Sequence, residues 1–219
     1  MSFKACIFDL DGVIVDTAKY HYLAWRRLAR ELGFDFSPEH NEQLKGVSRM
    51  KSLEILLEIG EKQLSEEEKF EAAGRKNSWY VDYITTLTPD EVLPGAKKFL
   101  EDVKRNKIKT AIGSASKNAG LILQRLDMKD FFDVVIDGTK VTRAKPDPEI
   151  FLAAARDLDV KPEEAIVFED AQAGVEAAHN GGMKCVGIGD PDLLEKADII
   201  IKGFENTSWK NIRTWLSRL

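Results

Sequence analysis

Cysteine is scarce in this chain of 219 residues. Only Cys6 and Cys185 are present, and each lies within an apolar run typical of a buried strand. So sparse a pair predicts free buried thiols in a reducing compartment, and it argues against a disulfide framework or a thiolate metal site. We therefore expect a cytoplasmic protein.

Long apolar segments and basic clusters are also missing. No window approaches the length of a membrane span, and the N-terminus lacks a charged segment followed by a long apolar stretch. The net charge of -5, with no basic helix face, gives no electrostatic footprint for nucleic acid or for an anionic membrane. We expect a monomer that binds small molecules, with neither a nucleic-acid nor a membrane partner.

What is present describes an ordinary globular protein. Hydrophobic residues make up 43% of the chain and charged residues 32%. The length allows one core domain with a second, smaller unit. No internal repeat, low-complexity segment or Gly/Ser linker is found along it.

The most informative stretch is Asp9-Leu10-Asp11-Gly12, which follows the apolar run Ala5-Cys6-Ile7-Phe8. A short apolar run that stops at Asp and Gly predicts a buried strand of a parallel sheet, with the ligand-binding end just beyond it. Asp9 and Asp11 can then share one crevice while Leu10 points back into the protein. Two close carboxylates need a cation, a shared proton, or a division into nucleophile and acid/base. A solvated turn is the simpler alternative for this motif taken alone.

Residues 18–87 read as entirely helical. An amphipathic pattern ends at Gly33, Ser37 and Ser48 are helix start signals, and Ser65 with Glu68 forms a capping box. We therefore expect a small helical cap domain over 17–87, inserted after the first strand of a core domain formed by 1–16 and 88–219. The expected hinges are 15–17 and 87–91.

From residue 96 onward helices and strands alternate. This pattern predicts an α/β fold, with a doubly wound parallel Rossmann-like sheet and helices on both faces. An amphipathic helix carrying Trp209, Ile212, Trp215 and Leu216 closes the chain. The predicted helices are 96–106, 118–126, 147–158 and 172–180, and the predicted strands are 109–113, 133–136, 165–168, 184–188 and 198–201.

Polar groups recur where these strands end. Ser114, Ser116, Lys117 and Asn118 precede a helix, and hydroxyl, ammonium and amide donors beside a helix N-terminus suit a phosphate. Simple capping by Ser116 is the alternative. Lys145 can neutralise a transferring group or can merely be solvated. The acidic pair after strand 165–168, Glu169-Asp170, together with the first acidic pair implies a metal between them.

Taken in order, Asp9-Leu10-Asp11-Gly12, Ser114, Lys145 and Glu169-Asp170 resemble the four motifs of the haloacid dehalogenase superfamily of phosphotransferases. The resemblance covers the whole chain. Within the helical segment, the residues that resemble the superfamily's sugar-phosphate mutases are Thr17, His21, 41–49, Ser52 and 75–77. The stretch 169–174 differs from the common mutase form only by Ala171 in place of Ser.

The resemblance implies a division of labour in the core. Asp9 would be the nucleophile that forms an aspartyl phosphate, and Asp11 the general acid/base. Ser114 and Lys145 would stabilise the transferring phosphoryl group. Mg²⁺ would be held by Asp9, the main-chain carbonyl of Asp11, Asp170, and Glu169 directly or through water.

It also implies roles for the helical segment. His21 and Lys76 would approach Asp11 when the segment closes over a sugar phosphate. Arg49 would grip the second phosphate together with Ser116, Lys117 and Asn118. The remaining candidate substrate-binding residues are Thr17, Trp25, Lys45, Gly46, Val47 and Ser52.

Plainer interpretations exist for several of these residues. Without its motif, Arg49 reads as an exposed helix residue, and His21 as a surface or packed imidazole. Trp25, Phe70 and Tyr80 have the spacing of core residues of the helical segment. His40 and His179 are expected at the surface.

The implied reaction is the interconversion of β-D-glucose 1-phosphate and glucose 6-phosphate through β-glucose 1,6-bisphosphate. The nearest alternative is a sugar-phosphate phosphatase on the same scaffold. A non-catalytic phosphosugar sensor is a third, against which the intact acidic and lysine motifs argue.

Overall fold

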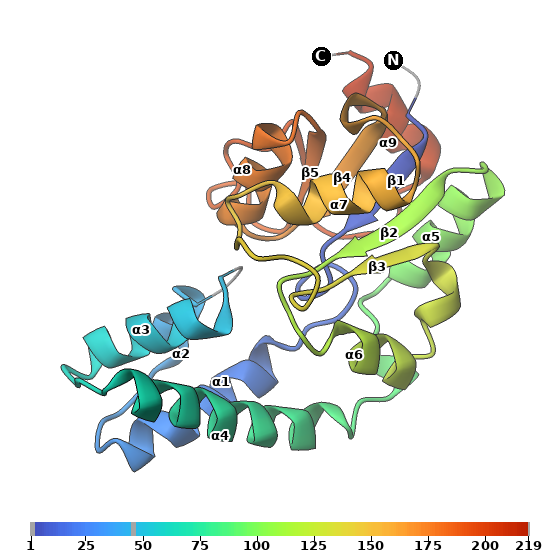
Figure 1. Cartoon of the computed structure of the whole chain (residues 1–219). Helices are drawn as coiled ribbons and strands as arrows, with labels where there is room; N and C mark the ends of the chain where they lie inside the picture. Colours follow the sequence, from blue (N-terminus) through green and yellow to red (C-terminus); the bar gives the residue numbers. More distant parts are fainter. Residues whose placement is uncertain (1–2, 45–46, 219) are drawn as a thin grey trace.

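A six-stranded parallel sheet forms the centre of the larger part of the molecule (Figure 1). The computed structural model describes residues 3–44 and 47–218. The strand order β3-β2-β1-β4-β5-β6 places β1 near the middle of the sheet. The strands are β1 (Ala5–Phe8), β2 (Lys109–Gly113), β3 (Val134–Ile136), β4 (Ala165–Glu169), β5 (Lys184–Ile188) and β6 (Ile199–Ile201).

The sheet is buried on both faces, as expected for a doubly wound fold. Alternate residues of β1 enter different cores: Cys6 and Phe8 pack in one cluster, Ala5 and Ile7 in the other. Helices α5, α6 and α9 cover the first face, and α7 and α8 cover the second. Their bounds are α5 (Ala96–Arg105), α6 (Ala119–Arg125), α7 (Glu149–Asp157), α8 (Gln172–Asn180) and α9 (Trp209–Leu216). The α/β fold class is therefore confirmed.

The register of the central strands fixes where the functional loops emerge. Phe8 pairs with Ile112 of β2 on one side and with Phe168 of β4 on the other. The residues that follow these strands leave the sheet at the same level of one edge. Short 3-10 helices lie in other connections: η1 (Pro89–Glu91), η2 (Lys129–Phe131) and η3 (Pro162–Glu164).

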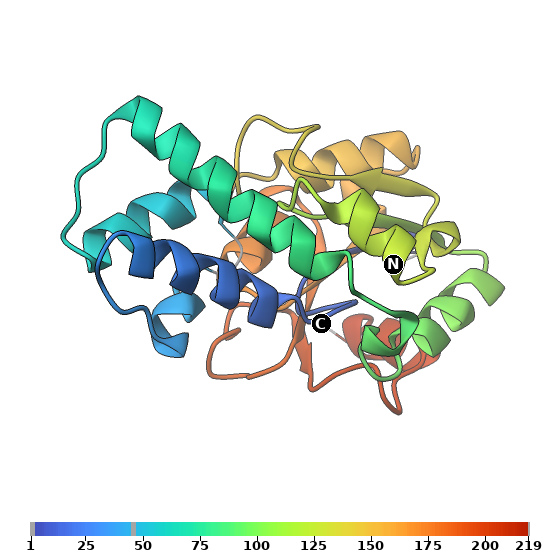
Figure 2. The same ribbon diagram turned by 90° about the horizontal axis from the view of Figure 1, so that it is seen from below.

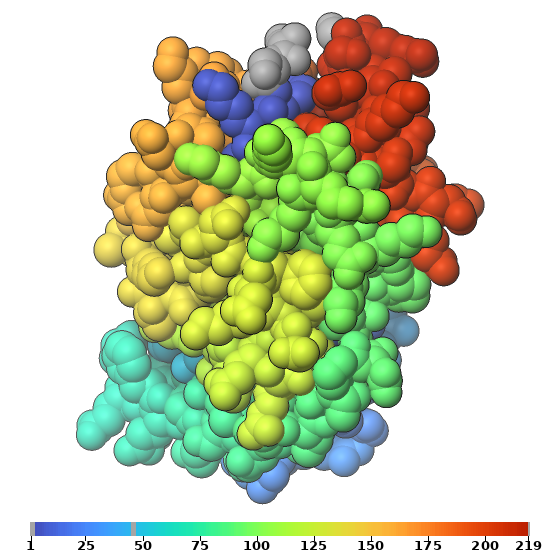
Figure 3. Space-filling model, turned by 90° about the vertical axis from the view of Figure 1, so that its right-hand side faces the viewer, coloured from blue at the N-terminus to red at the C-terminus, as the bar shows by residue number. Residues whose placement is uncertain are grey.

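Four helices between β1 and η1 form a separate layer beyond this edge of the sheet (Figures 1 and 2). We call them the helical insert: α1 (Ala18–Glu31), α2 (Pro38–Glu42), α3 (Arg49–Ile59) and α4 (Glu66–Ile84). They share a hydrophobic core of their own, which includes Trp25, Leu28 and Leu53. In Figure 3 the insert lies at the lower end of the molecule and α9 at the upper end.

The predicted helix starts of the insert are confirmed. Ser37, Ser48 and Ser65 are the N-caps of α2, α3 and α4, and each side chain accepts a hydrogen bond from the backbone three residues on. Glu68 completes the Ser65 capping box, since its Oε2 accepts from the Ser65 amide at 2.7 Å. These bonds satisfy amides that a helix leaves unpaired at its start.

The prediction of a core position is wrong for one residue of the insert. Phe70 is 67% exposed, whereas Trp25 and Tyr80 are buried. Phe70 lies in the first half of α4, where its side chain lines the cavity between the insert and the sheet edge and does not enter the hydrophobic core of the insert. In α9 a similar distinction applies: Trp215 is 38% exposed while Trp209, Ile212 and Leu216 are buried.

The two segments that join insert and core lie side by side. Val15 forms a β-bridge with Val92, and the Leu93 amide donates to the Ile14 carbonyl at 2.8 Å. Glu91 ties the start of α1 to this crossing, because its carboxylate accepts from Lys19 and Tyr20. The two connections between insert and core thus meet at one place, next to the predicted hinges 15–17 and 87–91.

Three smaller expectations are settled by the described residues. Cys6 and Cys185 are free and buried, as predicted. His179 is at the surface and bonds Asp198, while His40 is half-buried and its Nδ1 accepts from the Ser37 amide. Within residues 3–44 and 47–218, we find no helix with the length and apolar character that a membrane crossing requires.

Candidate active site

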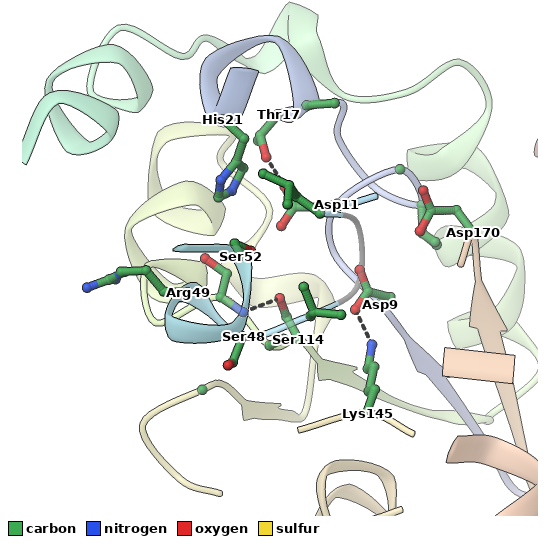
Figure 4. Close-up of a pocket in the computed structure, with 18 of the residues that line it drawn as sticks. Asp9, Asp11, Thr17, His21, Ser48, Arg49, Ser52, Ser114, Lys145 and Asp170 are labelled. Atoms are coloured by element: carbon green, nitrogen blue, oxygen red, sulfur yellow. Dashed lines mark hydrogen bonds and ion pairs between the residues drawn. The ribbon is translucent and has the colours of Figure 1, made fainter. Parts of the chain in front are cut away.

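Asp9 leaves the carboxyl end of β1 at the centre of the sheet edge. Its amide donates to the Phe168 carbonyl at 2.9 Å, which fixes the backbone, and its side chain is almost fully buried. Figure 4 shows the Asp9 carboxylate turned toward Lys145. Leu10 is fully buried, so the predicted alternation of this loop holds.

Asp11 lies on the insert side of the same loop. Figure 4 shows its carboxylate facing Thr17, whose hydroxyl donates to Asp11 Oδ1. The pKa of Asp11 is raised to about 8, mainly by burial and also by the nearby charge of Asp9, while Lys145 opposes the shift. A carboxyl group with this pKa can hold a proton near neutral pH, which suits a general acid.

Lys145 joins the two acidic strand ends. Its Nζ lies 2.5 Å from Asp9 Oδ1 and 2.5 Å from Glu169 Oε1. Burial acts to lower the pKa of Lys145, but the charges of Asp9 and Glu169 outweigh it, so the pKa is raised and the side chain stays cationic. Lys145 is therefore buried and ion-paired, and the alternative of a solvated lysine is wrong.

Glu169 and Asp170 face different partners. Glu169 Oε2 accepts from the Ala171 amide at 2.9 Å, so both of its oxygens are engaged. Burial raises the pKa of Glu169, and Lys145 opposes that shift. Asp170 instead lies close to Gly12 of the loop that follows β1.

Two glycines make room for this acidic pair. A Cβ atom built on Gly12 would lie 1.9 Å from Asp170 Oδ2, and one on Gly174 would lie 1.8 Å from Glu169 Oε1. Gly12 also has a φ of 77°, in the left-handed region that favours glycine. The absence of side chains here lets Asp170 pack against the Asp9-Asp11 loop.

This arrangement fits a magnesium ion. Mg²⁺ binds through one or two carboxylates and keeps several waters, so Asp9, Asp170 and a backbone carbonyl form a sufficient ligand set. Among the described residues no group of three or more His, Cys, Asp or Glu side chains is placed to hold a metal. That finding is compatible with Mg²⁺, because the expected site uses only two side chains directly.

The loop after β2 carries the hydroxyl and amide donors. Ser114 is buried, and its Oγ accepts from the Ser116 amide at 3.2 Å, which leaves its hydroxyl proton for another acceptor. Ser116 Oγ in turn accepts from the amide of Asn118, the N-cap of α6. The N-cap is Asn118 and it makes no side-chain capping bond, so the alternative of simple capping by Ser116 is wrong. Lys117 is exposed.

The insert contributes a buried pair of bases. Lys76 Nζ lies 2.8 Å from His21 Nδ1, although the residues come from α4 and α1. Burial lowers the pKa of both groups, and the charge of Arg49 adds to the shift in each. Lys76 is 2% exposed, and its Nζ lies 4.5 Å from the centre of the Trp25 ring.

Arg49 and Ser52 lie at the start of α3. Figure 4 shows the Arg49 side chain pointing away from Asp9, and burial lowers its pKa. Ser52 is buried. Lys45 and Gly46, two further candidates, fall outside the described residues.

One cavity of about 1060 Å³ lies between the insert and the sheet edge. It brings together all of the sequence-predicted site residues within the described ranges. These are Asp9, Asp11, Thr17, His21, Trp25, Val47, Arg49, Ser52, Lys76, Ser114, Ser116, Lys117, Asn118, Lys145, Glu169 and Asp170.

The model of haloacid dehalogenase-like hydrolases matches residues 3–182, which covers the β1 loop, the insert and all four polar strand ends. The chain belongs to the haloacid dehalogenase-like hydrolase family. The chain is similar to a β-phosphoglucomutase of Bacillus subtilis, 44% identical over 91% of this chain and 89% of that protein. A phosphorylated carbohydrates phosphatase of Thermotoga maritima is 35% identical over 83% of this chain and 82% of its own.

Solved structures of this family agree. The crystal structure of a β-phosphoglucomutase from Clostridium difficile matches with a TM-score of 0.95 and 44% identity. That match covers 99% of this chain and 98% of the other. The similarity therefore includes the helical insert as well as the sheet.

Some residues of this haloacid dehalogenase-like site were not predicted as site residues. The sequence predicts only a core position for Tyr80, yet its hydroxyl contacts Thr17. The signal was its spacing of four residues from Lys76 in one helix, which places both on one face. Asn77 was part of a matching stretch without a role, and its Oδ1 accepts from Asn118 Nδ2 at 3.1 Å. Gly12 and Gly174 become informative only once the sheet brings Asp170 and Glu169 beside them.

Proposed function

We propose that this protein interconverts β-D-glucose 1-phosphate and glucose 6-phosphate through an aspartyl phosphate on Asp9 and β-glucose 1,6-bisphosphate. The observation that carries the proposal is a single cavity with two cationic ends. Lys145 stands beside Asp9 in the core, while Arg49 points away from it on the insert. A sugar bisphosphate needs one reactive and one holding anion site. The similarity to two β-phosphoglucomutases supports this reaction.

Asp9 acts as the nucleophile in this proposal. One carboxylate oxygen attacks phosphorus of the bisphosphate, the bond from phosphorus to the sugar oxygen breaks, and the aspartyl phosphate forms. The departing sugar oxygen takes a proton from Asp11. In the return step Asp11 accepts a proton from the free hydroxyl of an incoming sugar monophosphate, and that oxygen attacks phosphorus, breaks the acyl phosphate bond and frees Asp9. Its raised pKa, about 8, suits a group that alternates between these two states.

Lys145 and Ser114 stabilise the phosphoryl group in transit. The Lys145 ammonium stays cationic because two carboxylates surround it, and the Ser114 hydroxyl has a proton to donate. Preorganised donors of this kind supply much of the catalysis of phosphoryl transfer.

Asp9, the main-chain carbonyl of Asp11 and Asp170 would hold Mg²⁺, with Glu169 acting through water. Bound there, Mg²⁺ neutralises the carboxylates and polarises the phosphoryl group. The close seating of Asp170 against Gly12 supports this assignment. Glu169 is the least direct of the four, because its oxygens already bond Lys145 and the Ala171 amide.

Arg49 grips the second phosphate, with Ser116, Lys117 and Asn118 on the opposite wall. Its planar guanidinium matches two phosphate oxygens at once. Thr17, Trp25, Val47 and Ser52 line the sugar-binding part of the cavity. Lys45 and Gly46 complete the proposed substrate site.

Residues 17–87 form a cap that closes on the core made of 1–16 and 88–219. The crossing at Val15 and Val92 supports one hinge region for this motion. Closure brings the His21-Lys76 pair toward Asp11, so that the acid/base is positioned only when a sugar phosphate is bound. Water then competes poorly for the aspartyl phosphate.

A sugar-phosphate phosphatase on the same scaffold is the second candidate. The relative named a phosphorylated carbohydrates phosphatase favours it. The two functions differ in whether the aspartyl phosphate passes to sugar or to water.

A coupled assay separates them. The enzyme with Mg²⁺ is given β-glucose 1-phosphate and a trace of the bisphosphate, and glucose 6-phosphate and inorganic phosphate are measured together. We expect glucose 6-phosphate to form, stimulated by the bisphosphate, with little phosphate released; the α-anomer serves as a control. Stoichiometric phosphate release without isomerisation would overturn the mutase assignment.

The proposal includes a monomer acting on small sugar phosphates in the cytoplasm. Two buried free thiols suit a reducing compartment. Size-exclusion chromatography with light scattering tests the monomer, and a dimer at working concentration would contradict it.

A further inference from the structure

Tyr80 of the helical insert contacts Thr17, His21 and Lys76. It lies in α4, is 1% exposed, and its hydroxyl is 3.3 Å from Thr17 Oγ1. Thr17 is itself fully buried and donates to Asp11 Oδ1. A hydrogen-bonded series therefore runs from Tyr80 through Thr17 to Asp11.

The order of donors in this series is set by chemistry. A hydroxyl carries one proton and can accept through its lone pairs. Because the Tyr80 hydroxyl donates to Thr17, the single Thr17 proton is left to point at Asp11. Successive hydrogen bonds of this kind also strengthen one another in a buried setting.

The Tyr80 ring contacts the other half of the site. Its centroid lies 4.0 Å from that of the His21 ring, and Lys76 Nζ lies 4.7 Å from it. These are the two groups that bond each other at 2.8 Å. Ser116 of the core loop also acts on the Tyr80 hydroxyl, lowering its pKa against the larger effect of burial.

Packing alone does not account for a tyrosine here. The ring belongs to a hydrophobic cluster with Ala24 and Ile84, and phenylalanine would fill the same volume. What distinguishes tyrosine from phenylalanine here is the hydroxyl, which donates a hydrogen bond to Thr17. Tyr83, about one turn later, offers a comparison: it stacks on Tyr20 with centroids 6.5 Å apart and lines a separate pocket with Leu23.

We propose that Tyr80 is a positioning residue that holds the Asp11 carboxylate in its working orientation through Thr17. Its ring packs against His21 and Lys76, while its hydroxyl bonds Thr17, so Tyr80 links this pair to the residues that hold Asp11. The proposal rests on the proposed role of Asp11 as the acid/base. It predicts that the hydroxyl of Tyr80 serves turnover and that substrate binding does not depend on it.

The test compares Y80F, T17V and the double variant, with Y83F as the matched control. Glucose 6-phosphate formation and phosphate release are followed together, and thermal unfolding checks that each variant is folded. We expect Y80F to lower kcat about five- to tenfold, since one buried hydrogen bond is worth roughly 1 kcal/mol, with KM changed less than about twofold. Y83F should keep both constants.

The double variant decides whether Tyr80 acts through Thr17. If it does, adding Y80F to T17V lowers kcat no further. T17S keeps the hydroxyl and should retain most of the activity that T17V loses, which tests the series without altering Tyr80. An unchanged kcat in Y80F, or losses that multiply in the double variant, would overturn the proposal.

Failure of this proposal is distinguishable from failure of the proposed function. If the wild-type enzyme releases phosphate in place of glucose 6-phosphate, the mutase assignment fails, but Asp11 still has to protonate the departing sugar oxygen. The effect of Y80F is then measured on phosphate release with the same expected loss.

Discussion

Lys76 and His21 lie with Nζ and Nδ1 2.8 Å apart inside the helical insert, although 55 residues separate them in the chain. Two groups that both bind protons are thus packed together beside the Arg49 cation, and burial lowers the pKa of each, with the charge of Arg49 adding to the shift. The arrangement favours a neutral imidazole in the folded protein. Because the folded protein disfavours a protonated His21, its free energy of unfolding should decrease at low pH.

The stability of the folded protein should fall below about pH 6.5 because of His21. In the unfolded chain the imidazole protonates near that pH, whereas burial and the charges of Lys76 and Arg49 keep it neutral in the fold. The unfolded state then binds more protons, so the free energy of unfolding decreases as pH falls, by up to about 1.4 kcal/mol per pH unit. Urea unfolding between pH 5 and 8 should show this slope reduced in H21Q. The same slope in both proteins would contradict the assignment.

D9N should abolish turnover and retain the fold. Asparagine keeps the shape of Asp9 and an oxygen for Lys145, but it cannot form the acyl phosphate. We expect a loss of at least about a thousandfold in kcat, since the whole covalent route is removed. The matched control is D190N, an exposed carboxylate that lines the same cavity and should keep near-normal activity. Residual D9N activity near the wild-type level would show that another residue is the nucleophile.

K145A should be far more destabilising than K117A. Removing Lys145 leaves Asp9 and Glu169 as buried neighbours without their common cation, a change that typically costs roughly 3 to 5 kcal/mol. Lys117 is exposed at the same cavity, so its loss should stay within about 0.5 kcal/mol. Chemical unfolding without Mg²⁺ measures both. Equal stabilities would mean that the two carboxylates relax or take up protons at little cost.

Much of the fold follows from local sequence patterns. The apolar run before Asp9, the three serine caps and the alternation after residue 96 each depend on neighbours within a few positions, and each was found within one or two residues. The strand predicted from Asp133 begins at Val134, and the helix predicted from Asp147 begins at Glu149. Asp133 and Asp147 instead accept backbone hydrogen bonds, from Thr110 and Glu149.

The candidate site was predictable where residue type and position at a strand end carry the information. It was not predictable where the information lies in three-dimensional packing. Phe70 has a core-like spacing, but the way the helices pack places its side chain at the cavity and not in the core of the insert. The hydrogen bond from the Tyr80 hydroxyl to Thr17 joins residues that are far apart in the sequence, so it becomes visible only in the folded structure.

G12A should remove Mg²⁺ binding that G33A leaves intact. Both glycines have left-handed backbone, with φ of 77° and 86°, so alanine should cost each about 1 kcal/mol of strain. Only at Gly12 would the new Cβ collide with Asp170 Oδ2; at Gly33 nothing lies within 4 Å. Displacing Asp170 removes one of the two carboxylates proposed to bind the ion. Titration calorimetry with Mg²⁺, and the rise in Tm that it produces, should therefore show a response in wild type and G33A but not in G12A. An equal response in all three proteins would remove Asp170 from the metal site.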